Sequence, residues 1–102
     1  MNFNSYKAAI INSLRELVNE LDGVYGIYGF GSFFRNNVYN DVDILVVSRA
    51  DSDMILYEYL RKEFQQLELF WGINFDMCFL SYNEYLRKPL LESNQFYVIS
   101  EF

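Results

Sequence analysis

The chain contains no histidine and only one cysteine, and these absences exclude several kinds of chemistry. Without histidine there is no Ser–His–Asp or Cys–His catalysis and no histidine-ligated zinc. The lone Cys78 cannot form an intrachain disulfide, which fits a reducing environment. The N-terminus lacks a basic-then-apolar signal pattern, and no apolar run approaches membrane-spanning length. We therefore expect a cytoplasmic protein that does not act at a membrane.

Basic residues are also scarce, with 8 Lys and Arg against 14 Asp and Glu and a formal net charge of −6. A nucleic-acid-binding protein normally carries a basic stripe, but here only Arg61–Lys62 and Arg87–Lys88 are adjacent basic pairs. Nucleic acid is therefore not expected as the main partner. An acidic protein that binds a phosphate compound needs divalent cations to do so.

Aromatic residues, by contrast, are abundant: 10 Phe, 9 Tyr and 1 Trp in 102 residues. A chain of this length forms one domain, residues 1–102. So many rings suggest either that part of the apolar surface is covered by a partner or a second copy in a homodimer, or that the core is simply rich in aromatics. Composition leaves both interpretations open.

Hydrophobic periodicity predicts alternating helices and strands along the chain. The long helix before the third strand is expected to begin at Asp51 or Ser52 and to connect two parallel strands, whereas the first two strands can be antiparallel. The predicted fold class is α/β (α+β), with a small mixed sheet of three or four strands and helices packed on it. The predicted helices are 4–22, one or two turns after residue 31, 51–67 and a short helix from 81 or 83 that ends before Pro89; the predicted strands are 24–29, 41–47, 73–80 and 95–100.

Three aspartates are placed where strands begin. Asp41 and Asp43 point to the same face, because side chains alternate along a strand. Asp76 lies near the start of the next strand and comes level with this pair if the two strands are parallel neighbours. Such a cluster is repulsive unless divalent cations bind it, and hard oxygen ligands favour Mg²⁺ or Mn²⁺. The alternative is that Asp41 belongs to an ordinary turn and Asp43 bonds nearby backbone. We expect Asp76 to be buried, where an unpaired carboxylate is disfavoured, and this favours the metal interpretation.

A glycine–serine turn precedes the aspartates. Gly29 and Gly31 allow a tight turn, and that is all a lone G-x-G need mean. In a functional site, Gly31 lets the backbone approach a ligand, and Ser32 with the following N–H groups favours phosphate. Arg35 either adds a charge-assisted contact to that ligand or is simply solvated.

Together these motifs resemble the DNA polymerase β-type nucleotidyltransferase superfamily, in its minimal form without a helical substrate-binding domain. Three parts carry the resemblance: the Gly31–Ser32 turn after a strand, Asp41 and Asp43 on the second strand, and Asp76 on the third. The resemblance implies that the turn grips the nucleotide's phosphates. It implies that the three aspartates bind two Mg²⁺ ions, with Mn²⁺ as a substitute, and that Asp76 helps to deprotonate the attacking hydroxyl.

The resemblance covers about residues 24–80 and also implies a function. Many minimal members are antitoxins of HEPN-domain ribonuclease toxins, and some transfer AMP to a toxin tyrosine. By analogy, we expect an EC 2.7.7-type enzyme that moves a nucleoside monophosphate, AMP from ATP, to a hydroxyl of a small helical partner protein, a HEPN-like toxin. The spacer between Ser32 and Asp41 is shorter than in the familiar antitoxins, and Asn36–Asn37 and Asn40 depart from their pattern. These departures concern the acceptor and the nucleobase.

Two other functions compete with this interpretation. One is a catalytically silent antitoxin or interaction module that acts by binding alone, and the other is a plain α/β domain with an incidental acidic cluster. If a protein acceptor docks over the aspartates, exposed aromatics are expected to form its interface. The sequence suggests Phe33, Phe34, Trp71 and Tyr97 for this role.

Overall fold

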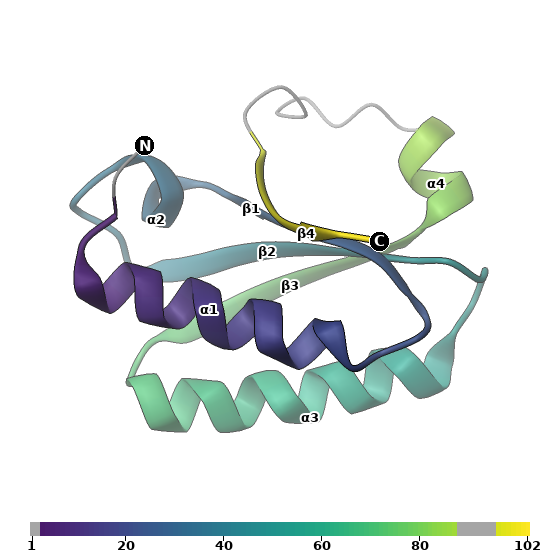
Figure 1. The fold of residues 1–102 in the computed structure, drawn as a ribbon, viewed down its shortest axis with the longest axis horizontal. Helices are drawn as coiled ribbons and strands as arrows, with labels where there is room; N and C mark the ends of the chain where they lie inside the picture. Colours follow the sequence, from purple (N-terminus) through teal and green to yellow (C-terminus); the bar gives the residue numbers. More distant parts are fainter. Residues whose placement is uncertain (1–2, 88–95) are drawn as a thin grey trace.

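The computed structural model describes residues 3–87 and 96–102, which form four helices and four strands (Figure 1). The predicted mixed α/β fold class is confirmed, and within the described residues every predicted element is present with ends shifted by a few residues. The proposed start of the last strand at residue 95 and the position of Pro89 lie outside the described residues. In chain order the elements are α1 Ser5–Asn19, β1 Val24–Phe30, α2 Ser32–Arg35, β2 Asp41–Ser48, α3 Met54–Trp71, β3 Asn74–Ser81, α4 Tyr82–Arg87 and β4 Tyr97–Glu101.

The four strands form one sheet in the order β3-β2-β1-β4. Strands β2 and β3 are parallel, while β1 is antiparallel to both β2 and β4. The parallel pair follows from the long crossover helix α3, and the antiparallel pair from the short connection through α2. The predicted strand directions are therefore confirmed, and β3 is an edge strand of the sheet.

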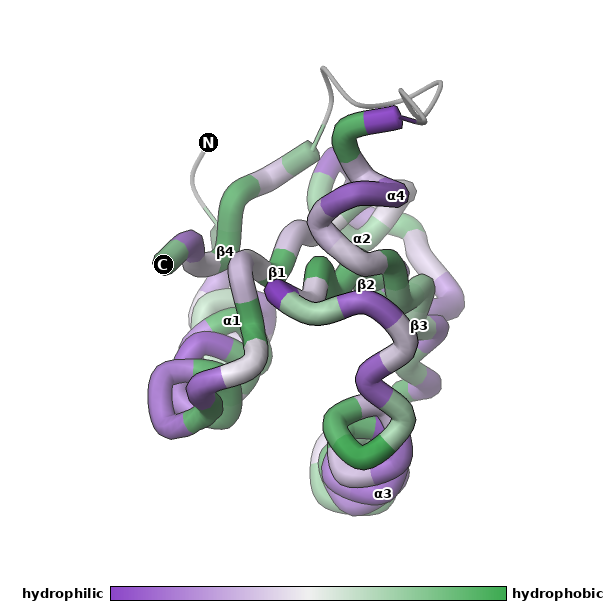
Figure 2. Tube along the Cα trace, turned by 90° about the vertical axis from the view of Figure 1, so that its right-hand side faces the viewer, coloured by the Kyte–Doolittle hydropathy of each residue, from purple (hydrophilic) through white to green (hydrophobic). Residues whose placement is uncertain are grey.

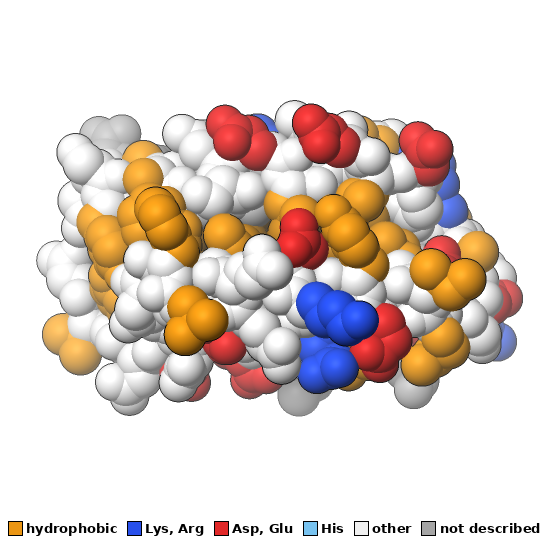
Figure 3. Space-filling view, turned by 90° about the horizontal axis from the view of Figure 1, so that it is seen from below, with side chains coloured by type: hydrophobic (Ala, Val, Ile, Leu, Met, Phe, Trp, Pro, Cys, Tyr) orange, Lys and Arg blue, Asp and Glu red, His pale blue; other side chains and the backbone are white. Residues whose placement is uncertain are grey.

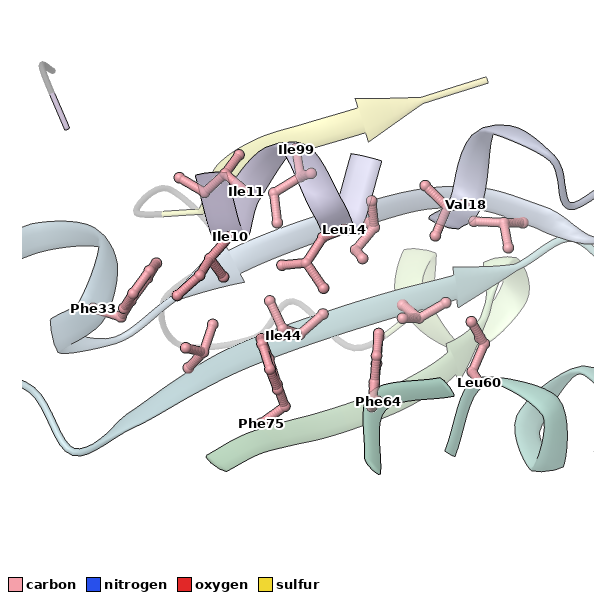
Figure 4. Packing of buried hydrophobic residues seen from close by; sticks show 14 of the residues in the cluster. Ile10, Ile11, Leu14, Val18, Phe33, Ile44, Leu60, Phe64, Phe75 and Ile99 are labelled. Atoms are coloured by element: carbon pink, nitrogen blue, oxygen red, sulfur yellow. The ribbon is translucent and has the colours of Figure 1, made fainter. Parts of the chain in front are cut away.

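Helices α1 and α3 cover the same face of the sheet, as the end-on view in Figure 2 shows. Each helix presents an apolar stripe at helical spacing, and alternate residues of the strands meet these stripes. The side chains interlock between sheet and helices without a polar group among those drawn in Figure 4. This core contains Ile10, Ile11, Leu14, Val18, Val24, Ile27, Phe33, Phe34, Val42, Ile44, Val46, Leu56, Leu60, Phe64, Phe75 and Ile99.

The opposite face of the sheet carries a second, smaller cluster around Tyr28, Leu45 and Val47. Helix α4 lies over this face in Figure 1, and it has only six residues. The cluster is bordered by partly buried apolar side chains, most of them aromatic: Tyr25, Phe30, Leu80, Tyr82, Tyr85 and Phe96. Many of the aromatic residues thus pack inside the molecule, which bears out an aromatic-rich core; a covering partner stays a prediction.

The prediction that Phe33 and Phe34 belong to an exposed partner interface is wrong. Phe33 and Phe34 are 0% and 2% exposed, respectively. Both rings point into the core from α2, where Phe34 stacks on Tyr97 and Phe33 meets Tyr39 edge-on. The short helix looks like a surface turn in the sequence, but burial of these two rings is what holds it against the sheet.

The helix ends follow the expected chemistry with one correction. The Asn4 side chain accepts a hydrogen bond from the Lys7 N–H and caps α1. Helix α3 is capped by Asp53, whose carboxylate accepts from the Leu56 N–H, and not by the predicted Asp51 or Ser52. Gly72 ends α3 in the left-handed conformation.

The outer face of α1 and α3 mixes charged and apolar side chains (Figure 3). On α3, Ile55, Leu69 and Phe70 are 86%, 87% and 76% exposed. None of the described helices combines the length and apolarity needed to cross a bilayer.

Candidate active site

Gly31 forms the turn between β1 and α2, and its conformation requires glycine. Its backbone has φ 79° and ψ −170°, a region that residues with a Cβ rarely adopt. A Cβ built at this position would collide with the Asp43 carboxylate. The pairing of Phe30 with Asp43 between β1 and β2 explains this closeness, because Gly31 is the next residue along the chain. The glycine turn and the second aspartate are therefore in direct contact.

The parallel register of β2 and β3 sets Asp76 level with Asp43, as predicted. Asp43 is the direct partner of Asp76, and Asp41 is the partner of Asn74. Paired positions on neighbouring strands lie about 4.8 Å apart, and their side chains point to the same face. All three aspartates lie on the face opposite α1 and α3, since Val42 and Ile44, which alternate with them, belong to the core beneath those helices.

The exposure of Asp76 differs from the prediction. Asp76 is exposed, whereas Asp41 and Asp43 are partly buried. Its neighbours Phe75 and Met77 turn toward the helices, while Asp76 points to the opposite sheet face, over which α4 lies in Figure 1. Burial therefore gives no argument for a metal at Asp76. The argument that remains is the register, which sets two carboxylates side by side.

The donor set fits a hard divalent cation. In residues 3–87 and 96–102 no three acidic, cysteine or histidine side chains are already grouped as a metal-binding cluster. A closed cage is not required, however, because Mg²⁺ in nucleotide enzymes is usually held by one or two carboxylates together with substrate phosphates and water. Asp43 and Asp76 provide two such oxygen ligands at paired positions, and Asp41 lies two residues away on the same face.

The other two residues predicted to bind the nucleotide lie at the same turn. Ser32 is the first residue of α2 and is partly buried. Arg35 is exposed on the last position of α2, and its Nε donates a hydrogen bond of 3.3 Å to the Gly31 carbonyl. The structure thus brings Gly31, Ser32, Arg35 and the aspartates to one end of the sheet. Their roles toward a nucleotide stay predictions.

Two further features of this region were not expected from the sequence. Cys78 follows Asp76 on the same face, and burial together with the carboxylates of Asp76 and Glu84 raises the pKa of its thiol. Lys7 is buried beneath α2, and its only sequence signal is its place on the apolar stripe of α1, three residues before Ile10.

A cavity of about 380 Å³ lies at the other end of β2 and β3, and it is not the site just described. Ser48 and Ser81, which end the two strands, both line it. The aspartates begin or lie near the start of the same strands, so strand length separates the cavity from them.

Comparison with known proteins now identifies the class. The model of the nucleotidyltransferase domain family matches residues 11–96, and the chain therefore belongs to this family. The fold is similar to that of a Sulfolobus solfataricus protein provisionally described as a nucleotidyltransferase, whose crystal structure was determined at 1.40 Å resolution. That similarity has a TM-score of 0.57 and 20% sequence identity, and it covers 94% of this chain and 84% of the other. No curated protein is significantly similar to the chain.

The superfamily expected from the motifs is thus confirmed, and the small size is consistent with its minimal branch. Membership supports nucleotidyl transfer as the general function and places the protein among the transferases of the 2.7.7 type.

Proposed function

We propose that the protein is a Mg²⁺-dependent nucleotidyltransferase that moves AMP from ATP to a hydroxyl group of a partner protein. The observation that carries the proposal is the in-register pairing of Asp43 with Asp76, directly beside the Gly31 turn. A carboxylate pair next to a backbone that has no side chain in the way is suited to a metal-bound triphosphate.

Each residue then has a defined task. Asp41, Asp43 and Asp76 would hold the two ions, Mg²⁺ or Mn²⁺, which when bound neutralise the triphosphate and orient its α-phosphate. The missing side chain of Gly31 lets the phosphates approach the backbone, and the Ser32 hydroxyl and Arg35 guanidinium are donors for phosphate oxygens. Asp76, the exposed member, accepts the proton of the attacking hydroxyl. The new bond joins the hydroxyl oxygen to the α-phosphorus, the α–β anhydride bond breaks, and pyrophosphate leaves.

The acceptor is proposed to be a protein on grounds of charge and access. The chain carries a net charge of −6, which disfavours the phosphate backbone of RNA or DNA as a docking partner. Asp76 is exposed on the sheet face opposite α1 and α3, so a macromolecular hydroxyl can reach it. A small helical protein, such as a HEPN-like toxin in a toxin–antitoxin pair, fits both conditions.

A second function is a catalytically silent module that suppresses its partner by binding alone. The observation in its favour is that no ready-made metal cluster is present among the described side chains. The two functions differ in whether the nucleotide becomes covalently attached to the partner.

Incubation with α-labelled ATP, Mg²⁺ and a co-encoded helical protein tests the proposal. We expect label on a hydroxyl side chain of the partner, loss of labelling in Asp43→Asn, and full labelling by Asp22→Asn, which removes an exposed carboxylate outside the site. If the partner binds tightly, stays unlabelled and is still inhibited by the Asp43→Asn protein, binding alone is the function. Label on tRNA or on a small metabolite would show that the acceptor is not a protein.

A further inference from the structure

Lys7 places a positive charge inside the protein, next to the glycine–serine turn. The side chain is only 5% exposed, although it extends from the first half of α1. Its Nζ donates hydrogen bonds to the carbonyl oxygens of Phe33, at 2.6 Å, and Asn36, at 2.5 Å. The same ammonium group lies 4.7 Å from the Tyr39 ring centroid and 5.1 Å from that of Phe33. These hydrogen bonds and ring contacts of the ammonium group all go to the segment between Gly31 and Asp41.

Burial of this charge costs free energy, and the cost suggests that the charge has a role. Within residues 3–87 and 96–102 no carboxylate pairs with Lys7, and removal of an ammonium group from water costs several kcal/mol. Burial accordingly lowers the pKa of Lys7. A leucine or methionine would fill the same space on the apolar stripe of α1 without that cost. What an apolar side chain lacks is the ability to donate two hydrogen bonds and to lie over two aromatic rings.

The segment that Lys7 holds is weakly organised by itself. Helix α2 has four residues, and two backbone hydrogen bonds, Phe34 N–H to Gly31 and Asn36 N–H to Ser32, close its turns. An isolated helix of this length does not persist in water, because so few bonds do not offset the entropy of ordering. The buried Phe33 and Phe34 rings anchor one side of it. The carbonyl groups of Phe33, the second residue of α2, and of Asn36, the residue after it, accept hydrogen bonds from Lys7.

Displacement of α2 would act on the site through Gly31. The missing Cβ of Gly31 faces the Asp43 carboxylate, so a shift of the turn changes its spacing from Asp43. Tyr39, whose ring also lies next to the Lys7 ammonium group, leads through Asn40 into Asp41. Lys7 thus contacts both ends of the segment that joins the two halves of the site.

We propose that Lys7 is a positioning residue for nucleotide binding, which ties α2 and Tyr39 to α1 and so fixes the Gly31–Ser32 turn relative to Asp41 and Asp43. The proposal rests on the nucleotidyltransferase function proposed above and deepens it. Lys7 itself does not touch the nucleotide, because both of its hydrogen-bonded partners are backbone carbonyls of the protein.

Calorimetric titration of Lys7→Met with Mg-ATP tests this role, with Lys62→Met as the matched control. Lys62 is exposed on α3, so its substitution removes the same charge without a buried contact. We expect Lys7→Met to bind Mg-ATP at least about tenfold more weakly and Lys62→Met to bind as the wild type does, since 1.4 kcal/mol corresponds to tenfold. Lys7→Arg, which keeps the charge and the donors, should recover part of the lost affinity.

Two readouts separate positioning from mere stabilisation. A stabilising residue changes the folded fraction, and therefore the binding stoichiometry, but leaves the Kd of the folded molecules unchanged. Hydrogen exchange without nucleotide should be faster in residues 36–40 of Lys7→Met and unchanged there in Lys62→Met. If Lys7→Met does not fold, Lys7→Gln and Lys7→Arg are compared instead, and equal Kd values for these two overturn the proposal.

Wild-type Kd in Lys7→Met overturns the positioning role alone. Absence of Mg-ATP binding by the wild-type protein overturns the proposed function and this inference together.

Discussion

Gly31 shows how one residue can serve both the backbone and the chemistry. Its φ of 79° is matched by Gly72, at φ 69°, but the surroundings of the two glycines differ. A Cβ at Gly72 would meet nothing within 4 Å, whereas at Gly31 it would meet the Asp43 carboxylate. Substitutions at the two positions therefore separate the effect of backbone strain from the effect of filling the space beside Asp43.

We predict that Gly31→Ala and Gly72→Ala both destabilise the protein, but that only the first abolishes Mg-ATP binding. Gly72→Ala should cost about 1 kcal/mol, the penalty for a Cβ in the left-handed region. Gly31→Ala should cost about 1–3 kcal/mol, because its ψ of −170° belongs to a region nearly exclusive to glycine. Urea unfolding and calorimetric titration measure the two effects. Unchanged Mg-ATP binding by Gly31→Ala would contradict the close approach of nucleotide and turn.

A second residue-scale prediction concerns pH and Tyr28. The hydroxyl of this residue donates a partly buried 2.6 Å hydrogen bond to Glu101, and burial, followed by that bond and the charge of Glu101, raises the pKa of Tyr28 well above 10. Below pH 10 the tyrosine is protonated in both folded and unfolded chains, so its contribution to stability is fully present and does not change with pH. Above pH 10 the unfolded chain loses the proton and the folded one retains it, so the free energy of unfolding should fall as pH rises, by at most about 1.4 kcal/mol per pH unit.

Tyr28→Phe isolates this effect from the other tyrosines. The substitution should destabilise the protein by about 1 kcal/mol at neutral pH, because it removes one partly exposed hydrogen bond. The difference in unfolding free energy between wild type and Tyr28→Phe should stay constant up to about pH 10 and shrink above it. A difference that stays constant to pH 11 would show that Tyr28 ionises normally in the folded protein.

At the scale of elements, local patterns predict most of the fold. The apolar run at 41–47 and the long helix after it specify a central strand with a parallel neighbour, and both are present. Once those strands are parallel neighbours, the alignment of Asp43 with Asp76 follows from the starting points of the two strands. The predictions that fail concern features that depend on contacts between distant segments. Asp76 is exposed on β3, which lies at the edge of the sheet, and the order of strands in a sheet depends on pairing that no local window encodes.

Helix α2 is the clearest example of a non-local outcome. Its polar flanks and short length are typical of a surface turn, yet Phe33 and Phe34 are buried because α1, the sheet and Tyr97 surround them. The same contacts bury Lys7, whose role depends on carbonyl groups 26 and 29 residues further along the chain. Candidate ligands can thus be found in the sequence, whereas the groups that position them cannot.

The start of α3 gives an element-scale prediction in which sequence and structure differ. Asp53→Ala should destabilise the protein by about 1 kcal/mol, because the Leu56 N–H loses its cap. Asp51→Ala should cost less than half as much, since Asp51 is exposed and accepts long bonds of 3.3 and 3.5 Å from Asn83. Thermal or urea unfolding of the two variants decides between the caps. A larger loss of stability in Asp51→Ala than in Asp53→Ala would support Asp51 as the cap, as expected from the sequence.

At the scale of the whole molecule, the distribution of charge sets the conditions for binding. The proposed substrate, a triphosphate, is an anion. The chain that would bind it has a formal charge of −6 and places further carboxylates at the binding site. Without a cation, the triphosphate meets both the local carboxylates and the net negative charge of the protein. Divalent ions reverse the sign of the local interaction, so metal and nucleotide should bind cooperatively.

The last prediction follows from this cooperativity. Removal of Mg²⁺ should weaken ATP binding at least about tenfold, and added monovalent salt should then strengthen the residual binding, because screening reduces a net repulsion. With Mg²⁺ present, salt should have a smaller effect, because the cation would already offset the repulsion that salt screens. Asp43→Asn should lose the Mg²⁺ dependence without unfolding, because it relieves repulsion between paired carboxylates instead of removing a core contact.

Titrations of ATP and of uncharged adenosine, with Mg²⁺ or EDTA at low and high salt, measure each of these effects. Adenosine should respond to neither metal nor salt. Equal ATP affinity with and without Mg²⁺ would mean that the aspartates do not hold the metal and that the nucleotide binds elsewhere on the chain.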